Sequence, residues 1–133
     1  MKTYQGSCHC GRVRFEADLD LSLGAGKCNC SICTKSRNWY VMIKPAQFRL
    51  LAGEEFLTDY QFGSNSVHHP FCKVCGVRPF RRGHLEAVGG DFYTVNPACL
   101  DDIDPKMLGE MPVRYADGRN NNWRSPPAET RYL

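Results

Sequence analysis

The chain has 133 residues, 42% of them hydrophobic and 23% charged, and carries a formal net charge of +3. This length and composition predict a single domain over residues 1–133 and exclude a disordered or low-complexity chain. No apolar run approaches the ~20 residues that cross a bilayer, and the first residues lack the apolar segment of a secretory signal. We therefore expect a cytoplasmic protein with no membrane partner.

Most of the chain is patterned as a series of short strands. Arg12–Ala17 alternates polar and apolar residues, which is typical of a half-buried strand. Segments rich in aromatic and β-branched residues predict further strands at Asn38–Ile43, Phe48–Leu51, Leu57–Phe62, Val67–Phe71 and Asp91–Asn96. The sequence therefore predicts a mainly β fold.

Helical signals are weak and local. Ser31–Ser36 predicts a short helical turn, and Asp104 followed by Pro105 is typical of an N-cap and a first helical residue. That pair predicts a helix through about Glu110. The residues after Pro112 are rich in Asn, Gly and Pro, so we expect an irregular C-terminal tail over residues 110–133.

Seven of the eight cysteines fall in three clusters along the chain: Cys8 and Cys10; Cys28, Cys30 and Cys33; Cys72 and Cys75. Cys8 and Cys10 would lie about 6.5–7 Å apart on an extended strand, near the upper limit for a disulfide. Cytosolic thiols also stay reduced, so these cysteines are predicted to bind metal. Seven thiolates with two Zn²⁺ ions would cancel the net charge, which removes the argument for a basic, nucleic-acid-binding protein. Cys99 stands alone and is expected to be a small buried hydrophobe.

Two of the cysteine pairs can together build one closed metal site. Cys72-Lys73-Val74-Cys75-Gly76 reads as a zinc knuckle, in which glycine permits the tight turn between two thiolates. A structural zinc takes four ligands, and two distant pairs supply them. Joining Cys8 and Cys10 with Cys72 and Cys75 would tie the N-terminal strand to the middle of the chain.

Three further cysteines lie within six residues and suggest a different kind of site. Cys28, Cys30 and Cys33 would leave a zinc ion one coordination position for water or substrate, which is characteristic of catalytic centres. Two alternatives remain open from the residues alone. The site could be a second closed zinc completed by Cys99 or a histidine, or Cys30 and Cys33 could form a redox pair.

The cysteine motifs, with their spacing and order, resemble those of the glutathione-dependent formaldehyde-activating enzymes. The matching stretches include Gly6-Ser7-Cys8-His9-Cys10-Gly11, Cys28-Asn29-Cys30-Ser31-Ile32-Cys33 and Phe71-Cys72-Lys73-Val74-Cys75-Gly76. The likeness covers roughly residues 4–104. Any one cluster would be a weak signal, whereas three clusters in this order are specific.

The resemblance implies small antiparallel sheets of β-tent type, stapled by a structural zinc on Cys8, Cys10, Cys72 and Cys75. It also implies a second, catalytic zinc on Cys28, Cys30 and Cys33, and so two zinc ions per chain. The implied activity joins glutathione to formaldehyde to give S-hydroxymethylglutathione, a carbon–sulfur lyase reaction in reverse. The expected partners are a small thiol and a small carbonyl compound. A homo-oligomer is compatible with the sequence, which does not fix the oligomeric state.

Glutathione has two carboxylates, so cationic and aromatic side chains are expected beside the catalytic cysteines. Four residues that follow the three cysteines are the candidates: Lys35, Arg37, Trp39 and Tyr40. The alternative is that they form a charged turn leading into a core strand.

Two alternative functions are also consistent with the sequence. One is a non-catalytic zinc module that binds protein or nucleic acid, for which Arg78–Arg82 is the only basic and aromatic stretch. The other is a thiol–disulfide enzyme acting through Cys30 and Cys33.

Overall fold

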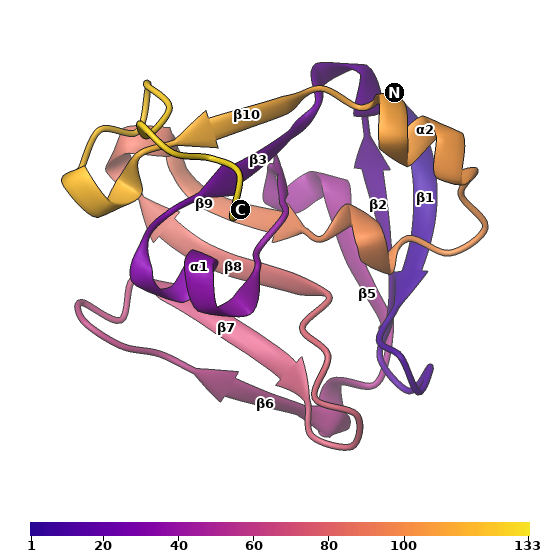
Figure 1. Ribbon diagram of the computed structural model, residues 1–133. Coiled ribbons are helices and arrows are strands. Elements are labelled where there is room, and N and C mark those ends of the chain that lie inside the picture. The colour runs from indigo at the N-terminus through magenta and orange to yellow at the C-terminus, as the bar shows by residue number, and fades with distance from the viewer.

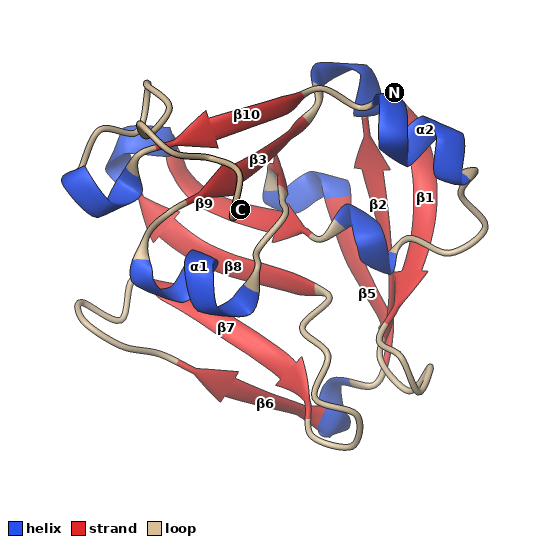
Figure 2. Cartoon of the chain, viewed as in Figure 1, coloured by secondary structure: helices blue, strands red, loops and turns tan.

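The computed structural model describes residues 1–133 and shows three small sheets with two short helices (Figures 1 and 2). The strands are β1 (Lys2–Ser7), β2 (Arg14–Leu19), β3 (Ala25–Cys28), β4 (Val41–Ile43), β5 (Phe48–Ala52), β6 (Leu57–Tyr60), β7 (Val67–Cys72), β8 (Phe80–Leu85), β9 (Gly90–Val95) and β10 (Val113–Ala116). The helices are α1 (Ser31–Ser36) and α2 (Pro105–Glu110), and 3₁₀ turns lie between several strands. Neither helix has the length and apolarity that crossing a membrane requires.

Two of the sheets are antiparallel and one is a parallel pair. The first sheet has the order β1-β2-β5, and the largest has the order β4-β9-β8-β7-β6. The third consists of β3 and β10, which run parallel with Val113 opposite Ala25 and Ala116 opposite Cys28. Parallel pairing needs a long connection between the strands, and here most of the chain separates them. The mainly β class with short helical turns, as predicted, is confirmed.

The sequence-based prediction of an irregular tail over residues 110–133 is wrong at Val113–Ala116, which forms β10. This segment is short and largely exposed, so it carries no strong strand pattern of its own. It becomes a strand because β3 offers an edge for pairing. The predicted strand at Asn38–Ile43 is also shorter in the structure, since only Val41–Ile43 pairs with β9. An N-terminal strand was expected without bounds, but Cys8 and Cys10, which were expected on it, lie in the turn after β1. Strands β3 and β8 were not predicted as elements.

Aromatic rings join the three-stranded sheet to the five-stranded sheet. Phe48 on β5 stacks on Tyr93 of β9 with ring centroids 4.3 Å apart, and lies 4.6 Å from Phe80 of β8. Phe15 of β2 stacks on Phe48 at 5.6 Å. Offset and tilted aromatic pairs add about 0.5–1.5 kcal/mol each beyond the area they bury. This cluster fixes how the two sheets lie against each other.

The five-stranded sheet has one face in this core and one face toward the cysteine cluster of α1. Val41 and Ile43 on β4 and Phe80 on β8 are buried in the core, whereas Met42 and Arg81 alternate with them and face the other way. Figure 1 shows α1 lying across this second face, in front of β8. The arrangement leaves a space between the sheet and α1 for a site.

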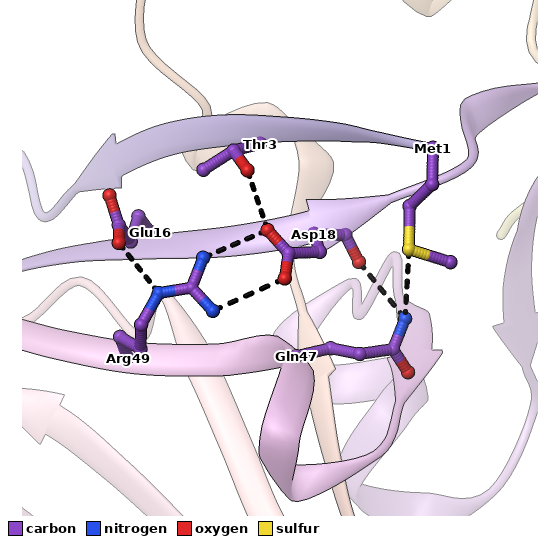
Figure 3. Close-up of polar contacts among 6 residues, drawn as sticks. All are labelled: Met1, Thr3, Glu16, Asp18, Gln47 and Arg49. Carbon is purple, nitrogen blue, oxygen red and sulfur yellow. Dashed lines mark hydrogen bonds and ion pairs between the residues drawn. The ribbon is translucent and has the colours of Figure 1, made fainter.

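Arg49 of β5 ties the outer face of the three-stranded sheet together (Figure 3). Its Nε donates to Glu16 Oε1 at 2.6 Å, and its Nη2 donates to Asp18 Oδ1 at 2.8 Å. Thr3 on β1 donates its hydroxyl to the same Asp18 oxygen at 2.6 Å. These contacts join β1, β2 and β5, and the Arg49 and Thr3 hydrogen bonds hold the pKa of the Asp18 carboxyl at about 2.

This lowered pKa predicts a specific pH dependence for Asp18→Asn. A carboxyl whose pKa is depressed in the folded state stabilises the protein above its ordinary pKa of 3.8 and loses that contribution toward pH 2. We expect the variant to unfold at lower urea concentration than the parent at pH 7, with the gap closing as the pH falls from about 4 toward 2. A pH-independent gap would contradict this account, and Glu55→Gln, a carboxylate outside every ion pair, is the control.

Candidate metal centres and the cavities around them

The first cysteine cluster brings four thiols together from two distant parts of the chain. Cys8 and Cys10 lie in the turn after β1, and Cys72 and Cys75 lie in the turn that ends β7. Their Sγ atoms all lie within 4.8 Å of one another, with Cys8 and Cys10 at 3.6 Å and Cys10 and Cys72 at 3.7 Å. A tetrahedral zinc with Zn–S bonds of ~2.3 Å places its sulfurs about 3.8 Å apart. The spacing fits a shared metal and is far beyond the ~2.05 Å of a disulfide.

Backbone groups around this cluster favour thiolates. The Val13 amide donates to Cys8 Sγ at 3.4 Å, and Gly76, at φ +78°, allows the chain to turn back after Cys75. Hydrogen bonds from the Arg12 backbone and side chain lower the pKa of the Cys10 thiol to about 6. A metal takes cysteine as thiolate, so these contacts suit metal binding.

The second cluster contains three thiols and no fourth ligand. Cys28 ends β3, Cys30 precedes α1, and Cys33 lies within α1. Their Sγ atoms lie within 4.8 Å of one another, and no histidine, carboxylate or further cysteine joins them at that distance. The predicted alternative of a closed site completed by Cys99 or a histidine therefore finds no support in the geometry. Cys99 packs against the main core instead.

Donors from three elements surround these thiols. The Cys30 amide donates to Cys28 Sγ at 3.3 Å, the Asn38 side chain donates to Cys33 Sγ at 3.4 Å, and Arg81 Nη1 lies 3.6 Å from Cys33 Sγ. Hydrogen bonds from the other two thiols lower the pKa of Cys33, and the charge of Arg81 adds to this shift. Hydrogen bonds with Cys30 and Cys33 instead raise the pKa of Cys28, so the negative charge of the cluster is favoured on Cys33.

Asn29, which lies between two of the cysteines, holds the C-terminal segment over this cluster. Asn29 is buried, and its Nδ2 donates to Asp117 Oδ1 at 2.8 Å. Its Oδ1 accepts from the Arg119 amide at 2.9 Å, and its carbonyl accepts from Arg119 Nε at 3.2 Å. One side chain therefore connects the cysteine loop to the residues that follow β10.

Gly118 is the point of closest approach between this segment and the cluster. A Cβ built at Gly118 would lie 2.5 Å from Cys28 Sγ and 2.6 Å from the Trp123 ring. Any larger residue would have to displace the thiol or the ring, so only glycine fits here. The stretch from Asp117 to Trp123, which the sequence left without an account, forms one wall of the site.

Two cavities meet at Cys30. The larger, of about 850 Å³, is lined by all three cysteines of the second cluster and by residues from the second face of the five-stranded sheet and the C-terminal segment; they include Tyr40, Met42, His69, Arg81, Phe92 and Trp123. The smaller, of about 570 Å³, is lined by Cys30, Ser31, Thr34, Lys35, Gly118 and Arg119. No carboxylate lines either cavity, whereas each contains two cationic side chains.

Of the four residues expected to bind glutathione, two line the cavities and two lie elsewhere. Lys35 lines the smaller cavity and Tyr40 the larger one. Arg37 lines neither and donates to the Tyr132 carbonyl at 3.1 Å. Trp39 also lines neither; it packs against the main core, with Lys27 Nζ 5.9 Å from its ring centroid.

Several site residues were missed by sequence reasoning, and Arg81 is the clearest case. The sequence places it in a basic stretch, but it is only 6% exposed and donates to Cys33 and, at 3.0 Å, to Ser36 Oγ. Its alternation with the apolar Phe80 was the available signal, because it assigns Arg81 to the face opposite the core. His69, also buried on that face, has an Nδ1 atom with no partner.

Comparison with known proteins agrees with this geometry. The family model of the glutathione-dependent formaldehyde-activating enzyme matches residues 3–116. The chain belongs to this family. The crystal structure of a Rhodobacter sphaeroides protein is similar at 33% sequence identity and a TM-score of 0.70, covering 83% of this chain and 99% of that one. Membership of the formaldehyde-activating family and the two cysteine clusters placed to bind metal are thus established together.

The two clusters predict different consequences for single cysteine substitutions. Cys72→Ser should lose one metal equivalent and lower Tm by about 10 °C or more, because the four-thiolate cluster joins two sheets. Cys33→Ser should lose one equivalent with a much smaller change in Tm. Elemental analysis and thermal melts measure both quantities.

Cys99→Ser is the matched control, since Cys99 lies outside both clusters. It should keep the full metal content of the parent protein. Equal changes in Tm for Cys72→Ser and Cys33→Ser would contradict the division into a structural and an open centre.

Proposed function

We propose that this protein joins a thiol to formaldehyde or a related small carbonyl, with glutathione as the thiol and S-hydroxymethylglutathione as the product. The observation that carries the proposal is the three-thiol cluster, which lacks a fourth protein ligand and is reached by two cavities. Membership of the formaldehyde-activating family supports the same reaction class. The activity is that of a carbon–sulfur lyase working toward synthesis.

The donor set of both clusters suits zinc, so we propose one structural and one catalytic zinc ion per chain. Thiolates are soft ligands that select zinc over the hard, oxygen-preferring cations. Cys8, Cys10, Cys72 and Cys75 would hold the structural ion, and Cys28, Cys30 and Cys33 the catalytic one. A zinc ion on three thiolates keeps one position open and lowers the pKa of a thiol that binds there.

The two carboxylates of glutathione would bind to cationic residues of the smaller cavity. Lys35 and Arg119 are its two cations, and Cys30 connects this cavity to the catalytic cluster. A thiol whose carboxylates contact Lys35 and Arg119 would have its sulfur beside Cys30. Positioning of this kind lowers the barrier because the reactants no longer need to find each other in solution.

The reaction balances without an oxidant or a reductant. The sulfur of the thiol forms a bond to the carbonyl carbon, the carbonyl π bond breaks, and the thiol proton ends on the new hydroxyl oxygen. Arg81 beside Cys33 and the Asn38 amide offset the negative charge of the cluster during this step. Both donors keep their charge throughout the reaction.

The structure weighs against the alternative of a nucleic-acid module. Such a module needs a basic stripe on the surface, but Arg81 is buried against Cys33 and the Nε of Arg78 is buried as well. Within Arg78–Arg82, Arg81 lines the site and Phe80 lies in the core, so Arg82 is the one exposed cation of the stretch.

Two variants test the proposed thiol site by calorimetric titration of the zinc-loaded protein with glutathione. Cys30→Ser should abolish glutathione binding while leaving the fold intact, because it removes the thiol at which the two cavities meet. Lys35→Gln should weaken binding about three- to fivefold, the effect of one exposed ion pair.

Glutathione diethyl ester, in which both carboxylates are neutral, provides the matched ligand. Its affinity should be the same for Lys35→Gln and for the parent protein. Lys106→Gln on α2, which lines neither cavity, should bind glutathione as the parent does. Undiminished glutathione binding by Cys30→Ser would overturn the proposed site, and NMR detection of S-hydroxymethylglutathione tests the reaction itself.

A further inference from the structure

The second face of the five-stranded sheet forms an apolar wall beside the three cysteines. It is defined by Met42, Val67, Leu85 and Phe92, one residue from each of four neighbouring strands, together with Phe62 from the segment after β6. The register places Phe92 opposite Gly83, and Gly83 is in turn opposite Val67. The missing side chain at Gly83 lets the Phe92 ring lie across it, since an added Cβ would come within 3.0 Å of that ring. The wall is thus built by strand alternation rather than by one irregular loop.

Large apolar side chains of this wall remain exposed. Met42 is 41% exposed, Phe62 44% and Leu85 38%, although all three lie in one concave surface. Single exposed apolar residues are common, but a contiguous concave group marks a place where a ligand is bound. No carboxylate lies among them.

Neither substrate of the simplest reaction explains the wall. Formaldehyde has one carbon and one oxygen and carries no apolar substituent, whereas the cavity measures about 850 Å³. Glutathione is a charged peptide, and the smaller cavity supplies Lys35 and Arg119 for its carboxylates. The larger cavity also contains Arg81 and Arg124, but Arg81 already donates to Cys33 and Ser36, and neither cation belongs to the apolar wall. Formaldehyde and glutathione therefore leave the apolar wall beside the catalytic cysteines without a matching ligand.

We infer that the larger cavity binds the apolar substituent of an alkyl or aryl aldehyde, whose carbonyl group lies at the three-cysteine cluster. This inference rests on the proposed function and specifies its carbonyl substrate. The chemistry stays the same: the thiol sulfur bonds to the aldehyde carbon, the carbonyl π bond breaks, and the proton passes to the oxygen to give a hemithioacetal. The thiol and the aldehyde enter from the two different cavities and meet at Cys30.

The test uses stable analogues of the adduct, namely S-methyl-, S-butyl- and S-hexylglutathione, titrated into the zinc-loaded protein by calorimetry. Each methylene that the wall buries should tighten binding about fourfold, so affinity should rise at least tenfold from the methyl to the hexyl compound. The same affinity for all three chains would overturn the inference.

A pair of leucine variants locates the effect. Leu85→Ser removes part of the wall and should flatten the dependence on chain length. Leu51→Ser changes a leucine of comparable exposure, 48%, that lines neither cavity, and should leave the dependence unchanged. Equal behaviour of the two variants would contradict the assigned wall.

A second series separates failure of this inference from failure of the proposed function. Propanethiol, butanethiol and hexanethiol share the chain but lack the peptide. If these thiols show the chain-length and Leu85 dependence while glutathione does not bind, the apolar wall stands and glutathione is the wrong thiol. If glutathione binds but neither series depends on chain length, the proposed function stands and the apolar aldehyde is wrong.

Discussion

The fold depends on holding four thiols from two distant segments within bonding distance of one ion. Cys8 and Cys10 follow β1, Cys72 ends β7 and Cys75 lies in the turn after it, and their Sγ atoms are spaced as a tetrahedral metal requires. Without a metal, such a group would place negative charges or unsatisfied thiols at the edge of the core. With it, the three-stranded sheet is fixed to the five-stranded sheet at one end, and the aromatic stack around Phe48 fixes them near the middle. The cluster of Cys28, Cys30 and Cys33 can then be built on short elements that need not stabilise the fold themselves.

The two cysteine clusters and the fold class could be predicted from the sequence, because metal ligands are recognisable by their spacing along the chain. The spacing of the cysteines in two pairs and a triplet predicted both clusters, and strand-like segments predicted the mainly β class, which the structure confirms. The features that could not be predicted are those that depend on contacts with residues far away in the sequence. β10 has no pattern of its own and exists only because β3 offers an edge, while Arg81 resembled a surface charge because its partner Cys33 is many residues away. Gly118 gave no signal at all, since its role is set by contact with Cys28 and Trp123.

The proposed reaction brings two substrates of different chemistry to one group of thiols. Cys30 borders two cavities, a smaller one lined almost entirely by polar and cationic residues and a larger one that contains the apolar wall, and the C-terminal segment anchored by Asn29 forms part of both. In the proposed reaction, the smaller cavity would bind the charged thiol and the apolar wall of the larger cavity would bind the substituent of the carbonyl compound. Burial of Arg81 and His69 between the sheet and α1 keeps polar groups available at the reacting end while the wall beyond them stays apolar.

The central claim is that one metal centre is closed by four cysteines and the other is left open by three. X-ray absorption at the zinc edge measures this, because it gives the mean number of sulfur atoms bound per zinc ion. The account predicts about 3.5 sulfur ligands per zinc in the fully loaded protein, since seven thiolates share two ions, rising to about 4 when glutathione is added. An average of 4 without glutathione, or a value that glutathione leaves unchanged, would contradict it.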